Sequence, residues 1–158
     1  MSNKNIRLCI QAHKECYKSK ITHKHGAIIA KGSKIITKGF NKSRSTFNGK
    51  LCLCTHAEID AIIKWINLCC KGVTNIAKKG KKYNLYVVRE NFAISQPCIM
   101  CTKMVMICNF KKIIYTTGND NIINVCRPKD LIDPIFTSAD RLHLSNISTY
   151  KQLSYLIQ

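Results

Sequence analysis

Two short apolar runs with one helical segment between them constrain the fold of this chain more than any other feature. Residues 84–89 (NLYVVR) and 112–116 (KIIYT) have the composition of buried strands. Residues 97–108, which start with a proline, have the composition of a helix. Two strands joined through a helix run parallel in one sheet, and the helix packs against that sheet. The chain is therefore expected to form a layered α/β domain.

The segments before this unit supply further layers. Residues 5–19 place apolar side chains at helical spacing, which predicts a first helix. A β-hairpin is expected over residues 25–40, followed by a polar, turn-rich loop over residues 41–54. Residues 56–70 predict a second amphipathic helix.

The C-terminal part has a weaker pattern. It predicts another helix and an edge strand among residues 120–128, 134 and 140–144, and a last helix over residues 150–157. The length of 158 residues fits one domain, with a motif-bearing core over about 21–118 and an extension over 119–158.

Composition bears on where the protein works. No apolar run approaches the roughly 20 residues of a membrane span, and no apolar signal core follows the first charged residues. We therefore expect a soluble cytoplasmic protein that has no contact with a membrane and keeps its 10 cysteines reduced. The 21 Lys, 23 Ile and 13 Asn indicate a low-GC source genome, such as that of a virus or a parasite.

The net charge leaves two interpretations open. The chain has 26 Lys and Arg against 8 Asp and Glu, a formal charge of +18, which attracts polyanions and anionic nucleotides. Only 5 of the 26 are Arg, the residue preferred for phosphate contacts, so a low-GC genome explains the excess as well as selection for nucleic-acid binding does. The basic segment that would contact nucleic acid comprises Lys78, Lys79, Lys81 and Lys82; its alternative is a solvated loop.

Two motifs carry the chemistry of the chain: His56-Ala57-Glu58 and Pro97-Cys98-Ile99-Met100-Cys101. Cysteines three positions apart at a helix start lie on one face and can share a metal ion, and the helix N-terminus favours their thiolates. A histidine from a second helix would complete a set of three ligands. Such a set leaves the fourth zinc position to water, as in catalytic sites. Glu58 then supplies a base two residues from a ligand.

Each motif also has a plainer interpretation. Thr55 and Glu58 fit a capping box, in which Glu58 only returns to the Thr55 amide. Cys98 and Cys101 could form a redox pair or half of a structural zinc site. Cys52 or Cys54 could add a fourth ligand and close the site. The two motifs together are more specific than either one.

The sequence His56-x-Glu58 followed by Pro97-Cys98-x-x-Cys101 resembles the zinc signature of the cytidine and deoxycytidylate deaminase superfamily. The resemblance runs from about His25 to Tyr115 and includes a first hairpin that ends in Gly39-Phe40-Asn41. It implies a three-layer α/β/α fold with a mixed sheet of about five strands, and zinc between the starts of the second and third helices. It also implies a homo-oligomer.

The resemblance implies a role for each matching residue. His56, Cys98 and Cys101 would hold Zn²⁺, and Glu58 would move protons between the zinc-bound water, the ring nitrogen and the leaving amine of cytosine. Asn41 would contact the sugar of the substrate, and the main chain of Ala57 and Cys98 would hold the edge of the base.

Three functions are compatible with these residues. The first is a zinc-dependent deaminase of a free cytosine nucleotide or nucleoside, with a deoxycytidylate-like nucleotide as the preferred substrate. The second deaminates bases within RNA or single-stranded DNA. The third is a non-catalytic, zinc-stapled protein that binds nucleic acid.

Four further expectations concern individual side chains. His23 and His25 could combine with Cys52 and Cys54 in a second, structural zinc site. Trp65, Met104 and Met106 stand at positions expected to be buried in the core.

Overall fold

The computed structural model describes residues 2–47, 50–70, 75–119 and 123–131, and the side chains of all of these except 44–47 and 50–53. The helix expected over residues 150–157, like the rest of the extension beyond residue 131, lies outside the described residues. Within the described part, no helix is both long and apolar enough to cross a lipid bilayer.

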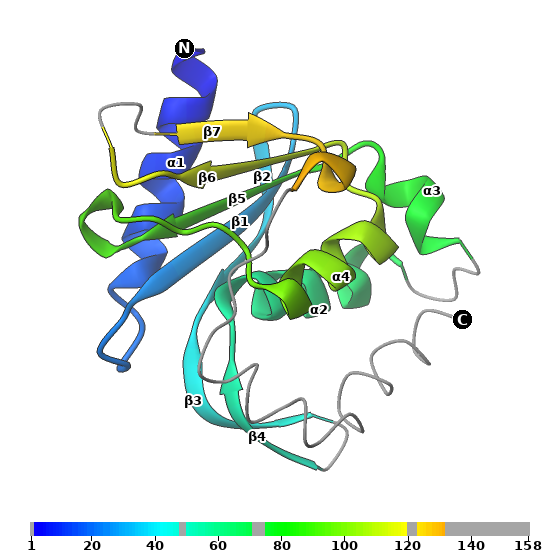
Figure 1. Ribbon diagram of the computed structural model, residues 1–158. Helices are drawn as coiled ribbons and strands as arrows, with labels where there is room; N and C mark the ends of the chain where they lie inside the picture. Colours follow the sequence, from blue (N-terminus) through cyan, green and yellow to red (C-terminus); the bar gives the residue numbers. More distant parts are fainter. Residues whose placement is uncertain (1, 48–49, 71–74, 120–122, 132–158) are drawn as a thin grey trace.

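A mixed sheet forms the centre of the molecule (Figure 1). Its strand order is β2 (Lys34–Phe40), β1 (His25–Lys31), β5 (Asn84–Arg89), β6 (Lys112–Thr116) and β7 (Ile123–Cys126). The pair β5–β6 is parallel and the other three pairs are antiparallel. The predicted five-stranded mixed sheet, its parallel unit and its C-terminal edge strand are therefore confirmed.

Helices cover both faces of this sheet. The helix α1 (Asn3–Cys16) packs on one face, and α2 (Ala57–Cys69) and α4 (Ile99–Cys108) lie on the other (Figure 1). Alternate strand residues serve the two layers: Leu85 and Val87 belong to the core under α2 and α4, whereas Tyr86 and Val88 belong to the core under α1. The three-layer α/β/α architecture is thus built from continuously apolar strands.

The first helix buries a different face from the one its aliphatic residues suggest. Its buried residues are Leu8, Cys9, Ala12, Glu15 and Cys16. Ile6, Ile10 and Tyr17 are exposed. Because Gly26 approaches within contact distance of Ala12 and Cys16, α1 presents its small residues to the strand. Close helix–strand contact therefore decides the buried face.

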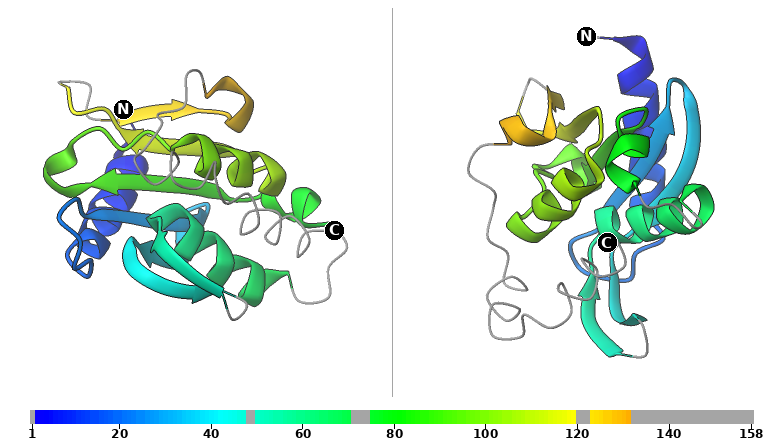
Figure 2. Two further views of the ribbon diagram at one scale, coloured as in Figure 1. Left: turned by 60° about the horizontal axis from the view of Figure 1, so that its bottom comes forward. Right: turned by 90° about the vertical axis from the view of Figure 1, so that its right-hand side faces the viewer.

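The expected loop over residues 41–54 is instead a two-stranded hairpin. The strands β3 (Lys42–Phe47) and β4 (Lys50–Thr55) pair antiparallel and extend away from the main sheet (Figures 1 and 2). The sequence contains a signal for this hairpin that we overlooked, the dipeptide Asn48-Gly49. Asn-Gly between two segments of alternating polar and apolar residues strongly indicates a hairpin.

Two other details differ from expectation. Lys78 and Lys79 lie in a short helix, α3 (Ile76–Gly80), and not in a loop. The helix α4 begins at Ile99 with Cys98 as its N-cap, so Pro97 precedes the helix. The remaining elements are the 3-10 turns η1 (Glu90–Phe92) and η2 (Pro128–Asp130).

The core positions predicted for Trp65 and Met104 are confirmed, because both side chains are buried. Trp65 packs edge-on against Tyr83 and Phe110, with ring centroids 5.3 and 5.0 Å apart. Met106 is 52% exposed, so its predicted burial is wrong. Two residues along a helix point about 200° apart, and Met104 already takes the inward direction.

A glycine fixes the distance between α2 and the sheet. A Cβ atom on Gly39 would lie 2.4 Å from the Ala57 carbonyl oxygen and 2.5 Å from the Ala61 nitrogen. Nearby, the Thr37 hydroxyl donates a hydrogen bond to the Ala61 carbonyl at 3.0 Å. Strand β2 and the first turns of α2 are thus in main-chain contact.

We expect Gly39→Ala to lower the free energy of unfolding by about 1–3 kcal/mol, because the added methyl must displace helix main chain. Denaturant unfolding measures this change, with Lys34→Ala at the exposed start of the same strand as the control. A Gly39→Ala protein as stable as that control would show that this contact is loose.

Candidate metal centre

Three potential metal ligands meet where two helices begin. His56 is the N-cap of α2 and Cys98 is the N-cap of α4, and Cys101 lies in the first turn of α4. Both N-caps have extended backbone, so their side chains project beyond the helix ends. The two Cys residues are buried and His56 is half-buried. Residues 42 positions apart in the sequence are thereby brought together.

The spacing of these ligand atoms fits zinc. His56 Nδ1 lies 3.4 Å from Cys98 Sγ and 3.3 Å from Cys101 Sγ. All three ligand atoms lie within 4.8 Å of one another. Tetrahedral zinc, with bonds of about 2.3 Å to sulfur and about 2.0–2.1 Å to nitrogen, would place such atoms about 3.5 Å apart. The donor set and its distances therefore fit one Zn²⁺ ion.

The group is charged in a way that favours metal binding. A hydrogen bond from Cys101, followed by one from His56, lowers the pKa of Cys98 to about 6, although burial opposes this shift. Burial also acts against charge on His56, but hydrogen bonds with Cys54 and Cys98 raise its pKa to about 11. These shifts favour the thiolate of Cys98, and a Zn²⁺ ion held by the group would take the place of the proton on His56.

Cys54 contacts the His56 ring but does not belong to the group of three ligands. Its thiol can orient the ring, as partners of metal-bound histidines do. Among the described side chains, no fourth Cys, His or carboxylate closes the site. Cys52, the other candidate for a fourth ligand, lies outside the described side chains.

Glu58 stands beside the metal ligands as a buried carboxylate that is 5% exposed. The helix begins at Ala57, which places Glu58 second and leaves Thr55 outside the N-cap position. No side-chain hydrogen bond caps α2 in the described structure, so the capping-box interpretation has no support. The negative charge of Glu58 instead acts on His56, Cys98 and His25.

Asp60, two residues further along, has a different environment. Its carboxylate pairs with Lys42 at 2.9 Å and Lys64 at 2.7 Å, and accepts a hydrogen bond from the Phe40 amide at 3.2 Å. Asp60 thus links α2 to strands β2 and β3. Glu58 is the carboxylate of this turn whose charge acts on His56 and Cys98.

The side chain of Asn41 links two segments of main chain. Its Oδ1 accepts a hydrogen bond from the His25 amide at 2.8 Å, and its Nδ2 donates to the His23 carbonyl at 2.6 Å. Asn41 is 7% exposed, and Ala57 is completely buried. Their contacts with a substrate stay predictions.

His25 has a place that the motifs did not indicate. It opens strand β1, and Glu58 and His56 both influence its pKa, which burial lowers. Its Nδ1 lies 3.2 Å from the His23 carbonyl oxygen, and Arg89 Nη2 lies 2.9 Å from His23 Nδ1. The overlooked signal is a polar residue that begins an otherwise apolar strand.

A second zinc site from His23 and His25 with Cys52 and Cys54 is not formed by the described side chains. The two histidines are instead linked to each other, to Asn41 and to Arg89. The Cys52 side chain is not among the described side chains, so its part in a second zinc site stays a prediction.

The predicted basic segment lies near the other end of α4. Lys79 Nζ donates a hydrogen bond to the Cys69 carbonyl, which ties α3 to the end of α2. Gly80 packs against the Cys108 carbonyl, at the C-terminal end of α4. The length of α4, about 15 Å for 10 residues, separates this region from Cys98.

Comparison with known proteins agrees with this geometry. The model of the cytidine and deoxycytidylate deaminase zinc-binding region matches residues 2–117. A cytidine deaminase from Burkholderia pseudomallei has a similar structure, with 21% identity, a TM-score of 0.58, and coverage of 86% of this chain and 100% of that one. A cytidine deaminase from Mycobacterium leprae gives 17% identity and a TM-score of 0.57, over 84% of this chain and 98% of that one.

A viral structure is also similar. The dCMP deaminase from the cyanophage S-TIM5, in its apo form, gives 23% identity and a TM-score of 0.51, over 77% of this chain and 90% of that one. No curated protein matches the chain. At these identities, the structural similarities establish the fold.

We expect one zinc ion per chain, and loss of zinc in His56→Ala and Cys98→Ala, because each change removes one of three ligands. Metal analysis of the purified proteins measures this loss. Cys9→Ala, which removes a buried thiol on α1, is the matched control and should keep its zinc. Full zinc content in both ligand variants would contradict the assignment.

Zinc affinity should also depend on pH. Zinc needs neutral imidazole and thiolate, so binding near neutrality displaces the proton of His56, whose pKa is about 11. Below about pH 6, Cys98 also carries a proton, and the affinity should fall more steeply. Competition with a chromophoric chelator at pH 5.5, 6.5 and 7.5 measures the trend. An affinity that does not change with pH would show that these groups are not the ligands.

Proposed function

This chain belongs to the cytidine and deoxycytidylate deaminase family, and from that membership we propose that it converts a cytosine nucleotide or nucleoside to the uracil form, with release of ammonia. A deoxycytidylate-like nucleotide is the substrate proposed first. The enzymes of this family are zinc-dependent hydrolases of a C–N bond. The family establishes the class of reaction, and the choice of base, sugar and phosphate is our proposal.

One observation carries the proposal. Glu58 is buried beside His56 and Cys98 and interacts with both through its charge, whereas Asp60 is held by Lys42 and Lys64. A purely structural zinc site has no need for a buried carboxylate next to its ligands. Hydrolytic deamination needs one, because protons must move to and from the reacting base.

The proposed roles divide among residues that the fold holds in place. His56, Cys98 and Cys101 would bind Zn²⁺, which supplies a Lewis acid that makes a water molecule more acidic. Two thiolates offset the charge of the metal, so the water still needs a base. Glu58 would accept one proton from the attacking water and deliver it to the ring nitrogen of cytosine. It would then take the second proton from the hydroxyl added to the ring carbon and pass it to the departing amine, so that ammonia leaves and the carbonyl of uracil forms.

Substrate contacts are proposed from the same region. Asn41 is fixed by the main chain of residues 23 and 25 and would contact the sugar through its remaining N–H. The main chain at Ala57 and Cys98 would hold the edge of the base. The His25 amide is hydrogen-bonded to Asn41, and the charge of Glu58 acts on the His25 ring. The start of β1 would therefore form one wall of the substrate site.

A non-catalytic zinc protein is the less favoured reading. It requires a fourth protein ligand, and the described side chains offer none within the ligand group. Zinc content alone does not separate the two functions, whereas turnover does. Ammonia release should be measured from cytidine, deoxycytidine, CMP, dCMP and dCTP, with cytosine-containing oligonucleotides as the polymeric alternative.

We expect Glu58→Gln to keep zinc and fold but to lose turnover by about 10⁴-fold, the upper end of what general acid–base catalysis contributes. Glutamine keeps the size and much of the hydrogen bonding of glutamate but cannot carry the proton. The measurement is kcat for ammonia release from the best substrate, together with zinc content.

The matched control is Glu90→Gln. It removes a carboxylate from the segment before α4, and the amide oxygen can still accept the hydrogen bond of the Lys24 amide. This variant should retain kcat within about twofold. A Glu58→Gln enzyme within tenfold of the parent would rule out Glu58 as the proton carrier and the proposed mechanism with it.

A further inference from the structure

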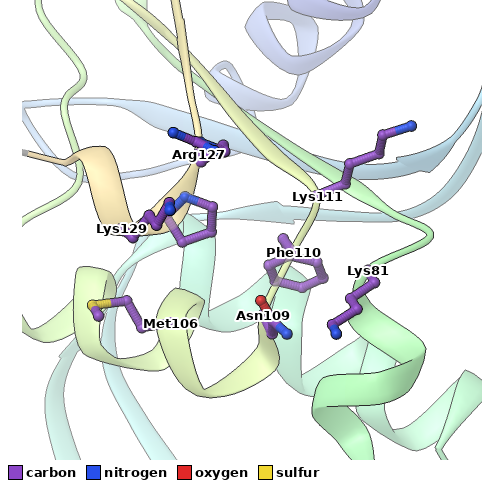
Figure 3. A pocket seen from close by; sticks show the side chains of 8 residues that line it. Lys81, Met106, Asn109, Phe110, Lys111, Arg127 and Lys129 are labelled. Carbon is purple, nitrogen blue, oxygen red and sulfur yellow. The ribbon is translucent and has the colours of Figure 1, made fainter.

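The C-terminal end of α4 borders a cavity (Figure 3). Cys98 lies at the opposite end of the same helix. Its volume is about 310 Å³, within the range of small-molecule sites. Eight residues line it: Lys81, Met106, Asn109, Phe110, Lys111, Arg127, Pro128 and Lys129. They come from the end of α3, the end of α4, the start of β6 and the turn η2, so residues distant in sequence build one hollow.

Half of the lining residues are cations, and all four are exposed. Arg127 donates hydrogen bonds to Asp130 from Nε at 2.7 Å and from Nη2 at 3.3 Å. In the part of the chain that the structure describes, Lys81, Lys111 and Lys129 form no ion pair. With Asp130 counted, three positive charges remain uncompensated around one cavity.

Three more exposed lysines, Lys78, Lys82 and Lys112, are near the lining residues in the sequence. The four cations that line the cavity, together with Asp130, leave a net charge of +3. The negative end of the α4 dipole, about half a charge, is small beside this total. A ligand for this surface must carry several negative charges.

The interior of the cavity is apolar. Phe110 is buried and packs against Trp65, and Pro128 is buried beside it. Met106 differs from Cys101, Met104 and Cys108 of the same helix, which are buried, because its side chain is 52% exposed. It borders the cavity. Because Phe110 and Pro128 are buried, the exposed side chain of Met106 is the apolar surface that one base could contact while its phosphates meet the cations.

Main-chain contacts hold the walls in place. A Cβ on Gly80 would lie 1.7 Å from the Cys108 carbonyl oxygen, so α3 rests directly on the end of α4. The Lys111 amide donates to the Tyr83 carbonyl at 2.8 Å, which joins the start of β6 to the segment after α3. Asn109 ends α4 in the left-handed conformation, with φ of 52°. The lysines are therefore attached to a fixed frame.

We propose that this cavity and the lysines beside it bind the phosphates and one base of a single-stranded nucleic acid. The four cations come from separate elements, which favours a strand, whose successive phosphates can reach several of them, over a single phosphate group. The exposed apolar side chain of Met106 favours a single strand over a duplex, whose bases are stacked inside. The surface is separate from the zinc ligands by the length of α4, so this proposal does not depend on the deaminase activity.

The test uses a fluorescently labelled 20-nucleotide oligodeoxythymidylate, which has no cytosine and cannot report on deamination. Fluorescence anisotropy gives its affinity for the zinc-loaded full chain over a range of salt concentrations. The cavity variant combines Lys81→Gln, Lys111→Gln and Lys129→Gln. The matched control combines Lys14→Gln, Lys31→Gln and Lys34→Gln, which removes the same charge from exposed positions on α1 and the β1–β2 turn.

We expect the cavity variant to bind at least tenfold more weakly than the parent. Its plot of log affinity against log salt should be shallower by about 2, since each phosphate contact with a single strand contributes about 0.7. The control should stay within about twofold of the parent. Thermal unfolding of both variants verifies that they are folded, and ammonia release from the small substrate should be unchanged in both.

Other outcomes would overturn the proposal. Equal weakening in both variants would mean that total charge, and not this cavity, attracts the strand. No binding by the parent at about 0.1 M salt would exclude a nucleic-acid site, and tighter binding of a 20-base-pair duplex would exclude preference for a single strand. Complete displacement of the strand by an equal concentration of a nucleoside triphosphate would assign the cavity to a free nucleotide.

Discussion

The parallel pairing of β5 with β6 is the constraint on which the metal centre depends. Parallel strands need a crossover, and here the crossover is α4, which must start near the end of β5 and return to the start of β6. The start of α4 carries Cys98 and Cys101. The start of α2 reaches the same place because Gly39 lets that helix touch β2. Strand pairing and one close approach together bring three ligands to one point.

Two carboxylates in the first turn of α2 illustrate how environment assigns chemical roles. Asp60 is tied to two lysines and a backbone amide, which fixes it as a structural link. Glu58 is buried, and its charge affects the pKa of His56 and Cys98. Residues two positions apart on a helix point in very different directions, so one turn places its two carboxylates in different surroundings.

The sequence was informative where side-chain chemistry is rare and spacing is regular. The His56, Cys98 and Cys101 group could be predicted because few residue types bind zinc, and the strand–helix–strand unit because its apolar pattern is continuous. The buried face of α1 could not, because it is decided by the fit of Ala12 against Gly26. Nor could the charge interaction of His25 with Glu58, which depends on the arrangement of two separate elements.

The positions of His56 and Cys98 as helix N-caps affect how stable the protein would be in the cell. Serine, threonine, aspartate or asparagine at these positions would satisfy free helix amides, and neither helix has a capping side chain. A metal ion that binds both N-caps would join the two helix starts directly and so do the work that caps do elsewhere. Metal supply would then govern folding yield and resistance to proteolysis, and the same chain would be degraded faster in a cell that lacks zinc.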